Sequence, residues 1–167
     1  MKVTLQSLQE TIMTYGAMID APFELLVLHS KASSDGSPFL ELCGEDIFFV
    51  SVERGIEFER LKTQKVDTFL YWFFKRVVSH IAYSATSNTD DRDQRRTVFD
   101  KEVELLSVLD KNWGEMRAKE HKAILLRSPF DDNAQKRVEL NKKLISDGLD
   151  TSRAYEKACE TYPLPQN

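Results

Sequence analysis

The chain has 167 residues, of which 41% are apolar and 30% are charged, a length and composition typical of a single compact domain. A chain of this kind can bury a substantial core, which excludes global disorder. Its 23 basic and 27 acidic residues give a formal net charge of -4, the wrong sign for a general nucleic-acid-binding or membrane-coating protein.

The sequence predicts a protein of the cytoplasm. No stretch approaches the roughly 18 consecutive apolar residues of a membrane-spanning helix. Gln, Glu and Thr interrupt the apolar residues at the beginning of the chain, so we expect no signal peptide. Cys43 and Cys159 lie far apart without metal-ligand spacing, which favours two free thiols in a reducing compartment.

The first predicted element is an amphipathic helix over residues 3–15. Leu5, Leu8 and Ile12 recur at helical spacing, and Gly16 is expected to end the helix. The alternation in residues 23–29 then predicts a short strand, and residues 33–38 predict a connection rich in turns.

The register of the next strands can be predicted from their apolar pattern, because a slip of one residue would turn every buried side chain outward. A three-residue loop at residues 53–55 places Val52 opposite Ile56 and Val50 opposite Phe58, which makes one face almost wholly apolar. A two-residue loop would set Val52 opposite a glutamate and bring carboxylates into the core face. We therefore predict the three-residue loop.

The same reasoning makes residues 44–46 the preceding loop and predicts an antiparallel meander of three or four strands. Leu40 and Leu42 then lie on the inner face beside Val50 and Phe48. Polar and aromatic residues alternate with them and form two rows across the outer face: Glu41, Phe49 and Glu59 in the first row, and Phe39, Ser51 and Glu57 in the second.

Residues 66–83 are apolar on almost every side, which is consistent with a central helix or a pair of strands. A run of this length without Gly or Pro favours the helix. We expect this helix to lie across the inner face of the meander. Its deepest stripe is predicted to consist of Phe69, Trp72, Phe73, Val77 and Ile81.

The rest of the chain is predicted to be helical. The fold class is therefore α+β, with a small meander packed against a long central helix and followed by a helical C-terminal half, all within one domain of residues 1–167. The expected later elements are a helix over residues 99–109 capped by Asp93, a helix from Trp113 that ends at Ser128-Pro129, a helix from Asp131 or Asp132 to Gly148, and a short last helix capped by Asp150 or Thr151.

No catalytic motif is present. His29, His80 and His121 fall on different predicted elements without metal-ligand spacing, so we interpret them as structural, with His80 partly buried on the central helix. Signatures of nucleotide binding, serine hydrolysis and hydride transfer are also missing. We predict no catalytic residue, no cofactor, no metal site and no enzymatic activity.

A group of charged residues precedes the helix at residues 99–109. Asp90, Asp91 and Asp93 resemble a metal-binding cluster only superficially, because Arg92, Arg95 and Arg96 break the spacing and neutralise the charge. We interpret the group as a solvated loop that caps the helix. The alternative is an arginine patch that pairs with the carboxylates of a partner.

The sheet region is acidic. Residues 41–59 contain six acidic side chains against the single base Arg54, a net charge of -5. Carboxylates interleaved with aromatic rings favour the binding of a basic protein, because charge steers the encounter and rings supply buried contact area. Two other interpretations stay open: a helix covers this face, or the charges keep the sheet edges soluble.

The motifs of the chain, taken in order, resemble the immunity proteins of bacterial polymorphic toxin systems, specifically immunity protein family sixty-three. The resemblance covers about residues 10–132, and residues 133–167 form a helical C-terminal extension beyond it. The motifs that carry it are Tyr15-Gly16, Ala21-Pro22, Asp35-Gly36-Ser37-Pro38, Glu53-Arg54-Gly55, Leu70-Tyr71-Trp72, Arg95-Arg96 with Phe99, Glu104-Leu105-Leu106, Trp113 and Pro129-Phe130.

The resemblance implies a cytoplasmic antidote that binds and inactivates a cognate protein toxin, often a nuclease, by steric occlusion. It carries over no contact residue, so our candidates come from the outer face and the loop. A small cytoplasmic adaptor or chaperone-like module is the alternative, and an unrecognised enzyme is a third possibility. Neither nucleic acid nor a membrane is an expected partner. The candidate partner-binding residues are Phe39, Glu41, Phe49, Glu53, Arg54, Glu57 and Glu59.

Overall fold

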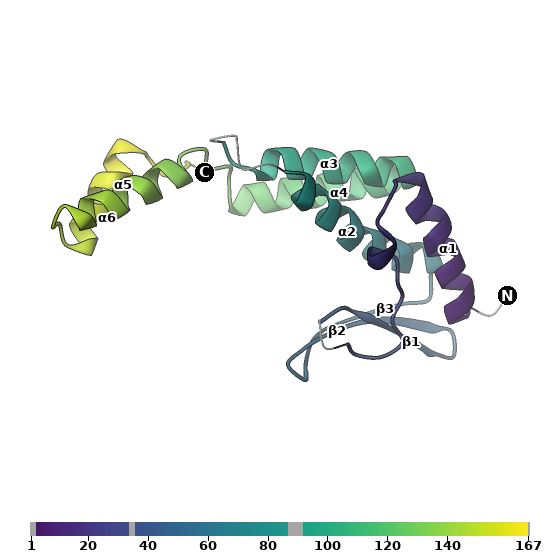
Figure 1. The fold of residues 1–167 in the computed structure, drawn as a ribbon. Helices are drawn as coiled ribbons and strands as arrows, with labels where there is room; N and C mark the ends of the chain where they lie inside the picture. Colours follow the sequence, from purple (N-terminus) through teal and green to yellow (C-terminus); the bar gives the residue numbers. More distant parts are fainter. Residues whose placement is uncertain (1–2, 34–35, 87–91, 167) are drawn as a thin grey trace.

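A computed structural model describes residues 3–33, 36–86 and 92–166 and confirms the α+β class. A three-stranded antiparallel sheet in the order β1-β2-β3 lies at one end, and helices extend from one of its faces (Figure 1). In chain order the elements are α1 (Leu5–Met18), the 3-10 helix η1 (Phe23–Leu25), β1 (Phe39–Cys43), β2 (Asp46–Glu53), β3 (Ile56–Thr63), α2 (Val66–Ala85), α3 (Arg95–Leu109), α4 (Lys111–Arg127), α5 (Ala134–Ser146) and α6 (Thr151–Thr161).

Helix α1 begins at Thr4, whose side chain accepts a hydrogen bond from the backbone N–H of Ser7 in a capping box. The helix does not end at Gly16, as we predicted, but continues to Met18. Gly16 has a packing role instead: a Cβ at this position would lie only 2.3 Å from a methyl carbon of Leu26. The glycine therefore allows the following segment to pack closely on α1.

The predicted strand over residues 23–29 is wrong. Its first part is η1, and only His29 forms an isolated parallel bridge, to Phe39. The side chain of Gln9 binds the backbone that a neighbouring strand would otherwise pair with: its Nε2 donates to the Leu26 carbonyl oxygen, and its Oε1 accepts from the Leu28 N–H, both at 2.8 Å. The Gln9 side chain therefore satisfies the backbone hydrogen-bonding groups of Leu26 and Leu28 without pairing to a neighbouring strand.

The predicted sheet register is also wrong. Both hairpin turns have two residues. Val50 of β2 pairs with Phe39 of β1 and, because of a bulge between Ser51 and Val52, with Arg60 of β3. The turn after β2 consists of Arg54 and Gly55, whose φ angles of 51° and 80° suit a tight hairpin turn. The bulge between Ser51 and Val52 shifts the pairing of β2 with β3 by one residue, so that apolar side chains of the two strands again lie on the same face. Our prediction did not consider a bulge.

Helix α2 covers the inner face of the sheet, as predicted. The ring of Phe49 on β2 packs edge-on against Phe69 at 5.6 Å between centroids and also contacts Phe73. Trp113 of α4 extends this core, because it stacks on Phe74 of α2 and contacts Tyr15 of α1. One continuous apolar cluster therefore joins the sheet to α1, α2, α3 and α4.

The last two helices stand away from this cluster. Figure 1 shows α5 and α6 side by side as a hairpin beyond the end of α4. Ala154 and Ala158 are its fully buried apolar side chains within the described part of the chain. We call α5, α6 and the turn between them the C-terminal arm (residues 134–161). The predicted Asp150 cap is confirmed, and its carboxylate accepts from the N–H of Arg153.

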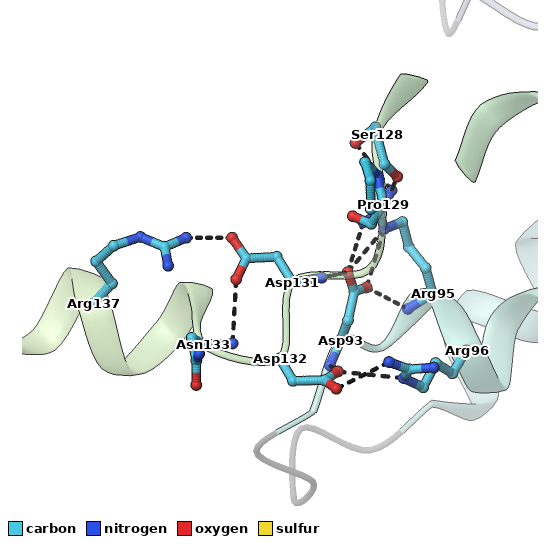
Figure 2. A network of polar contacts seen from close by, with 9 residues as sticks. All are labelled: Asp93, Arg95, Arg96, Ser128, Pro129, Asp131, Asp132, Asn133 and Arg137. Atoms are coloured by element: carbon cyan, nitrogen blue, oxygen red, sulfur yellow. Dashed lines mark hydrogen bonds and ion pairs between the residues drawn. The ribbon is translucent and has the colours of Figure 1, made fainter. Parts of the chain in front are cut away.

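Polar contacts hold the linker between α4 and the arm (Figure 2). Asp93 accepts a hydrogen bond from the backbone N–H of Asp131, and the Asp131 carboxylate pairs with Arg137 of α5. Asp132 pairs with Arg96, and Arg95 donates to the carbonyl oxygen of Pro129. The start of α3 therefore fixes the path of the chain into the arm.

Candidate functional site: an exposed hairpin on the sheet

The end of the β2–β3 hairpin presents large apolar side chains to solvent. Ile56 is 71% exposed and Phe58 is 65% exposed. Because the turn has two residues and a bulge precedes it on β2, these side chains lie at and beside the tip instead of opposite Val52 and Val50 in the core. The predicted register placed both side chains in the core. The alternation of Ile56 and Phe58 with glutamates is the sequence signal of a solvent-facing strand.

Acidic side chains surround this apolar pair. Glu53 precedes the turn, and Glu57 and Glu59 alternate with Phe58 along β3. All three are exposed, and Glu53 and Glu59 form no ion pair with any residue that the structure describes. We call Glu53, Arg54, Ile56, Glu57, Phe58 and Glu59 the hairpin surface. It carries three carboxylates and one guanidinium around two apolar side chains.

Arg60 marks the boundary of the hairpin surface. Its guanidinium donates to Glu57 and to Glu41 of β1, each at 2.7 Å. These hydrogen bonds raise the pKa of Arg60, and the bond from Arg60 lowers the pKa of Glu57. Glu57 and the guanidinium are therefore charged at neutral pH, and Arg60 neutralises part of the acidic charge that we counted from the sequence.

The predicted candidate residues divide into two groups in the structure. Glu41, Glu53, Arg54, Glu57 and Glu59 have solvent-accessible side chains. Phe39 and Phe49 do not: Phe49 points inward onto α2, and Phe39 is buried beside Val50. The two rings cannot be exposed anchors, because Phe49 pairs with Leu40 and Leu61 on the inner face and the ring of Phe39 is covered.

Phe48 takes the central place on the outer face instead. The cations of Arg60 and Lys62 lie 5.4 and 5.6 Å from the centre of its ring, and Lys62 also pairs with Asp46. Internal charge pairs and cation–π contacts therefore occupy this part of the face. Beyond it, Ala32 and Gly36 border a hollow together with Val52 and Phe58.

A buried polar cluster lies between α2, α3 and α4. The Glu102 carboxylate is 1% exposed; it accepts from Ser79 and from Nε of Arg117, and it lies 2.6 Å from Nε2 of His121. Burial raises the pKa of Glu102, but the hydrogen bonds from His121 and Ser79 and the charge of Arg117 outweigh it and lower the pKa overall. The cluster is enclosed and joins three helices.

The histidines are distributed differently from our expectation. His80 is exposed, and His121 is the buried one, stacked on Phe99 with 3.8 Å between ring centres. His29 and His80 line a pocket of about 120 Å³ together with Glu24 and Arg76. Within residues 3–33, 36–86 and 92–166, no group of three or more His, Cys, Asp or Glu side chains could hold a metal ion.

The arginines before α3 contact residues of their own chain. Arg95 pairs with Asp93, and Arg96 pairs with Asp132 and lies 4.1 Å from the ring centre of Phe130. These contacts do not favour the alternative that both guanidinium groups pair with a partner. Asp90 and Asp91 lie outside the described residues. Among the helices that the structure describes, none is long and apolar enough to cross a membrane.

The fold and the hairpin surface define a small α+β protein with an exposed acidic and apolar edge, a surface suited to binding another protein. Residues 44–123 match the protein family described as Immunity protein 63, which confirms the resemblance to this immunity protein family over that segment. The match includes β2, β3, α2, α3 and most of α4 and is shorter than the range of 10–132 that we expected. No curated protein and no solved structure matches the chain.

Proposed function

We propose that this protein binds a cognate bacterial toxin and neutralises it by steric occlusion, and that the hairpin surface is the contact. The observation that carries the proposal is the exposure of Ile56 and Phe58 beside Glu53 and Glu59, two carboxylates without an ion pair among the described residues, inside the segment that matches the immunity protein family. Glu41 lies next to this contact, because it pairs with Arg60 at the edge of the hairpin surface. The rings of Phe39 and Phe49 are buried and stabilise the sheet beneath the contact.

Apolar and acidic residues have separate tasks in this proposal. Fully burying a side chain such as Ile56 or Phe58 contributes about 1.5–3 kcal/mol, so the pair supplies the anchor. Glu53 and Glu59 attract a basic partner at long range and raise the association rate. A toxin that acts on nucleic acid has a basic active-site groove, which the carboxylates of the hairpin surface occupy in place of phosphates.

Growth protection tests the contact. The toxin encoded beside the gene is expressed together with the wild type, with Phe58→Ser, or with Ile56→Ser combined with Phe58→Ser. We expect the double variant to lose protection and to bind the toxin at least 100-fold more weakly. Leu126→Ser is the matched control, because Leu126 is 80% exposed but lies on α4. Full protection by the double variant would exclude the hairpin surface.

Stoichiometry tests the mode of action. If the protein acts by occlusion and has no enzymatic activity, toxin inhibition rises linearly with added protein and is complete at a fixed molar ratio. Inactivation of many toxin molecules by one protein molecule would instead show turnover. The titration is read from residual toxin activity, with the folded double variant as the inactive reference. A failure of the wild type to bind the toxin at any ratio would refute the proposed function.

A further inference from the structure

Strand β3 is an unprotected edge of the sheet. The order β1-β2-β3 leaves one side of β3 without a neighbouring strand. Outside its ladder with β2, no hydrogen bond reaches the backbone of residues 56–62 anywhere in the described chain. Alternate N–H and C=O groups of β3 therefore point to solvent, which is the arrangement that accepts an added strand.

The opposite edge of the sheet is partly closed. Strand β1 is met by His29, whose carbonyl oxygen accepts from the Leu40 N–H at 2.8 Å. The chain just before His29 is held on α1 through Gln9. A strand that approached β1 would have to displace this segment, whereas nothing in the described chain blocks β3.

We propose that β3 accepts an extended, basic segment of the toxin as a fourth strand of the sheet. This inference rests on the proposed function and specifies how the hairpin surface is used. Backbone hydrogen bonds along residues 59–63, where the ladder with β2 is regular, give the added strand its direction and register. Phe58, Ile56 and the carboxylates beside them then select its side chains.

Charge favours a basic segment over a second copy of this chain. Twofold antiparallel pairing of β3 with itself places a residue opposite its own copy at the centre. If the twofold axis passes at Glu59 or Arg60, that charged side chain lies opposite its own copy. If the axis passes at Leu61, Arg60 of one copy lies opposite Lys62 of the other. Like charges directly opposite destabilise a strand pair. A foreign strand with cations near Glu53 and Glu59 has no such conflict.

Amide hydrogen exchange by NMR tests the inference on the full-length protein, free and bound to the toxin encoded beside the gene. We expect the outward N–H groups of β3 to exchange rapidly in the free protein. In the complex, alternate residues along 59–63 should be protected at least 100-fold, and backbone contacts to a toxin strand should appear. Toxin binding with unchanged exchange along β3 would overturn the added strand but leave the proposed function intact. Absence of binding would overturn both.

Charge reversal tests the chemistry of the segment. Glu59→Lys should weaken toxin binding at least tenfold and remove part of its salt dependence. Glu45→Lys is the matched control, because Glu45 is also exposed and lies in the turn between β1 and β2, away from the β3 edge. Equal effects of the two substitutions would overturn the basic segment. A free protein that is dimeric, with its β3 amides already protected, would show that a second copy occupies the edge.

Discussion

Nε2 of His121 lies 2.6 Å from a carboxylate oxygen of Glu102, and both side chains are buried between α3 and α4. Arg117 approaches the same carboxylate, so Glu102 is the shared acceptor of the cluster. Removing one partner of a buried ion pair leaves the other charge uncompensated, which is more costly than losing a surface pair. The stability of the helical body therefore depends on this carboxylate.

Glu102→Gln should lower the free energy of unfolding by about 3 kcal/mol. The pKa of Glu102 is lowered in the folded protein, so its contribution is present above the ordinary glutamate pKa of about 4.3 and is lost as the pH falls through the folded value. Urea denaturation between pH 7 and pH 3 should show a smaller acid-induced loss in the variant. Glu104→Gln, exposed on the same helix, should change stability by less than about 0.5 kcal/mol.

The contact between α3 and α4 predicts a steric effect at Gly114. A Cβ at this position would lie 3.0 Å from the Cβ and 3.2 Å from the Cα of Ser107, so rotating the serine hydroxyl away does not make room. Gly114→Ala should therefore destabilise the protein by about 2 kcal/mol despite the higher helix propensity of alanine. In a double-mutant cycle measured by chemical denaturation, Ser107→Gly should recover part of that loss; strictly additive effects would contradict the contact.

Helical spacing predicted most of the helices from the sequence, because each helix buries a stripe that its own residues define. Phe69, Phe73 and Val77 are buried on α2 as expected. The junction between α3 and α4 was predicted only approximately, with one helix ending at Leu109 and the next beginning at Trp113. In the structure Asp110 both ends α3 and caps α4. Local signals of this kind are sufficient where an element is long and periodic.

The sheet register and the polar cluster depend on distant contacts, which a single sequence does not reveal. A two-residue turn with a bulge gives nearly the same apolar pattern along the sequence as a three-residue turn. We therefore predicted Ile56 and Phe58 to lie in the core, whereas they are exposed. Glu102 and His121 lie 19 residues apart on different helices, and only tertiary packing brings them together. The carboxylates at 53, 57 and 59 are exposed as predicted, because charged side chains rarely lie in a core.

Two phenylalanines on neighbouring strands test the corrected register. Phe49→Ala should cost about 3–4 kcal/mol, since its ring is 2% exposed and packs on Phe69 and Phe73. Phe58→Ala should change stability by less than about 0.5 kcal/mol, because its ring faces solvent. Thermal or urea unfolding of the two variants measures both values. The opposite ranking would support the register with the three-residue loop.

The C-terminal arm depends on polar contacts because its two helices share little apolar core. Arg137 pairs with Asp131 and donates to the carbonyl oxygens of Tyr162 and Pro163, which ties the arm to the linker and to the end of the chain. Helices of this length are marginal in isolation. Losing these charged hydrogen bonds should cost the arm about 2 kcal/mol of local stability.

Arg137→Ala should therefore speed hydrogen exchange in α5 and α6 by roughly 30-fold, the rate equivalent of that loss, and leave α2, α3 and α4 unchanged. The body is unaffected because its apolar cluster contains no residue of the arm among those described. Exchange measured peptide by peptide with mass spectrometry separates the two regions. Arg153→Ala is the matched control, since Arg153 lies exposed on α6 and its pair with Asp150 is a surface contact. If exchange rose equally in α2, the arm and the body would unfold as one cooperative unit, and the view of the arm as a separately held hairpin would be wrong.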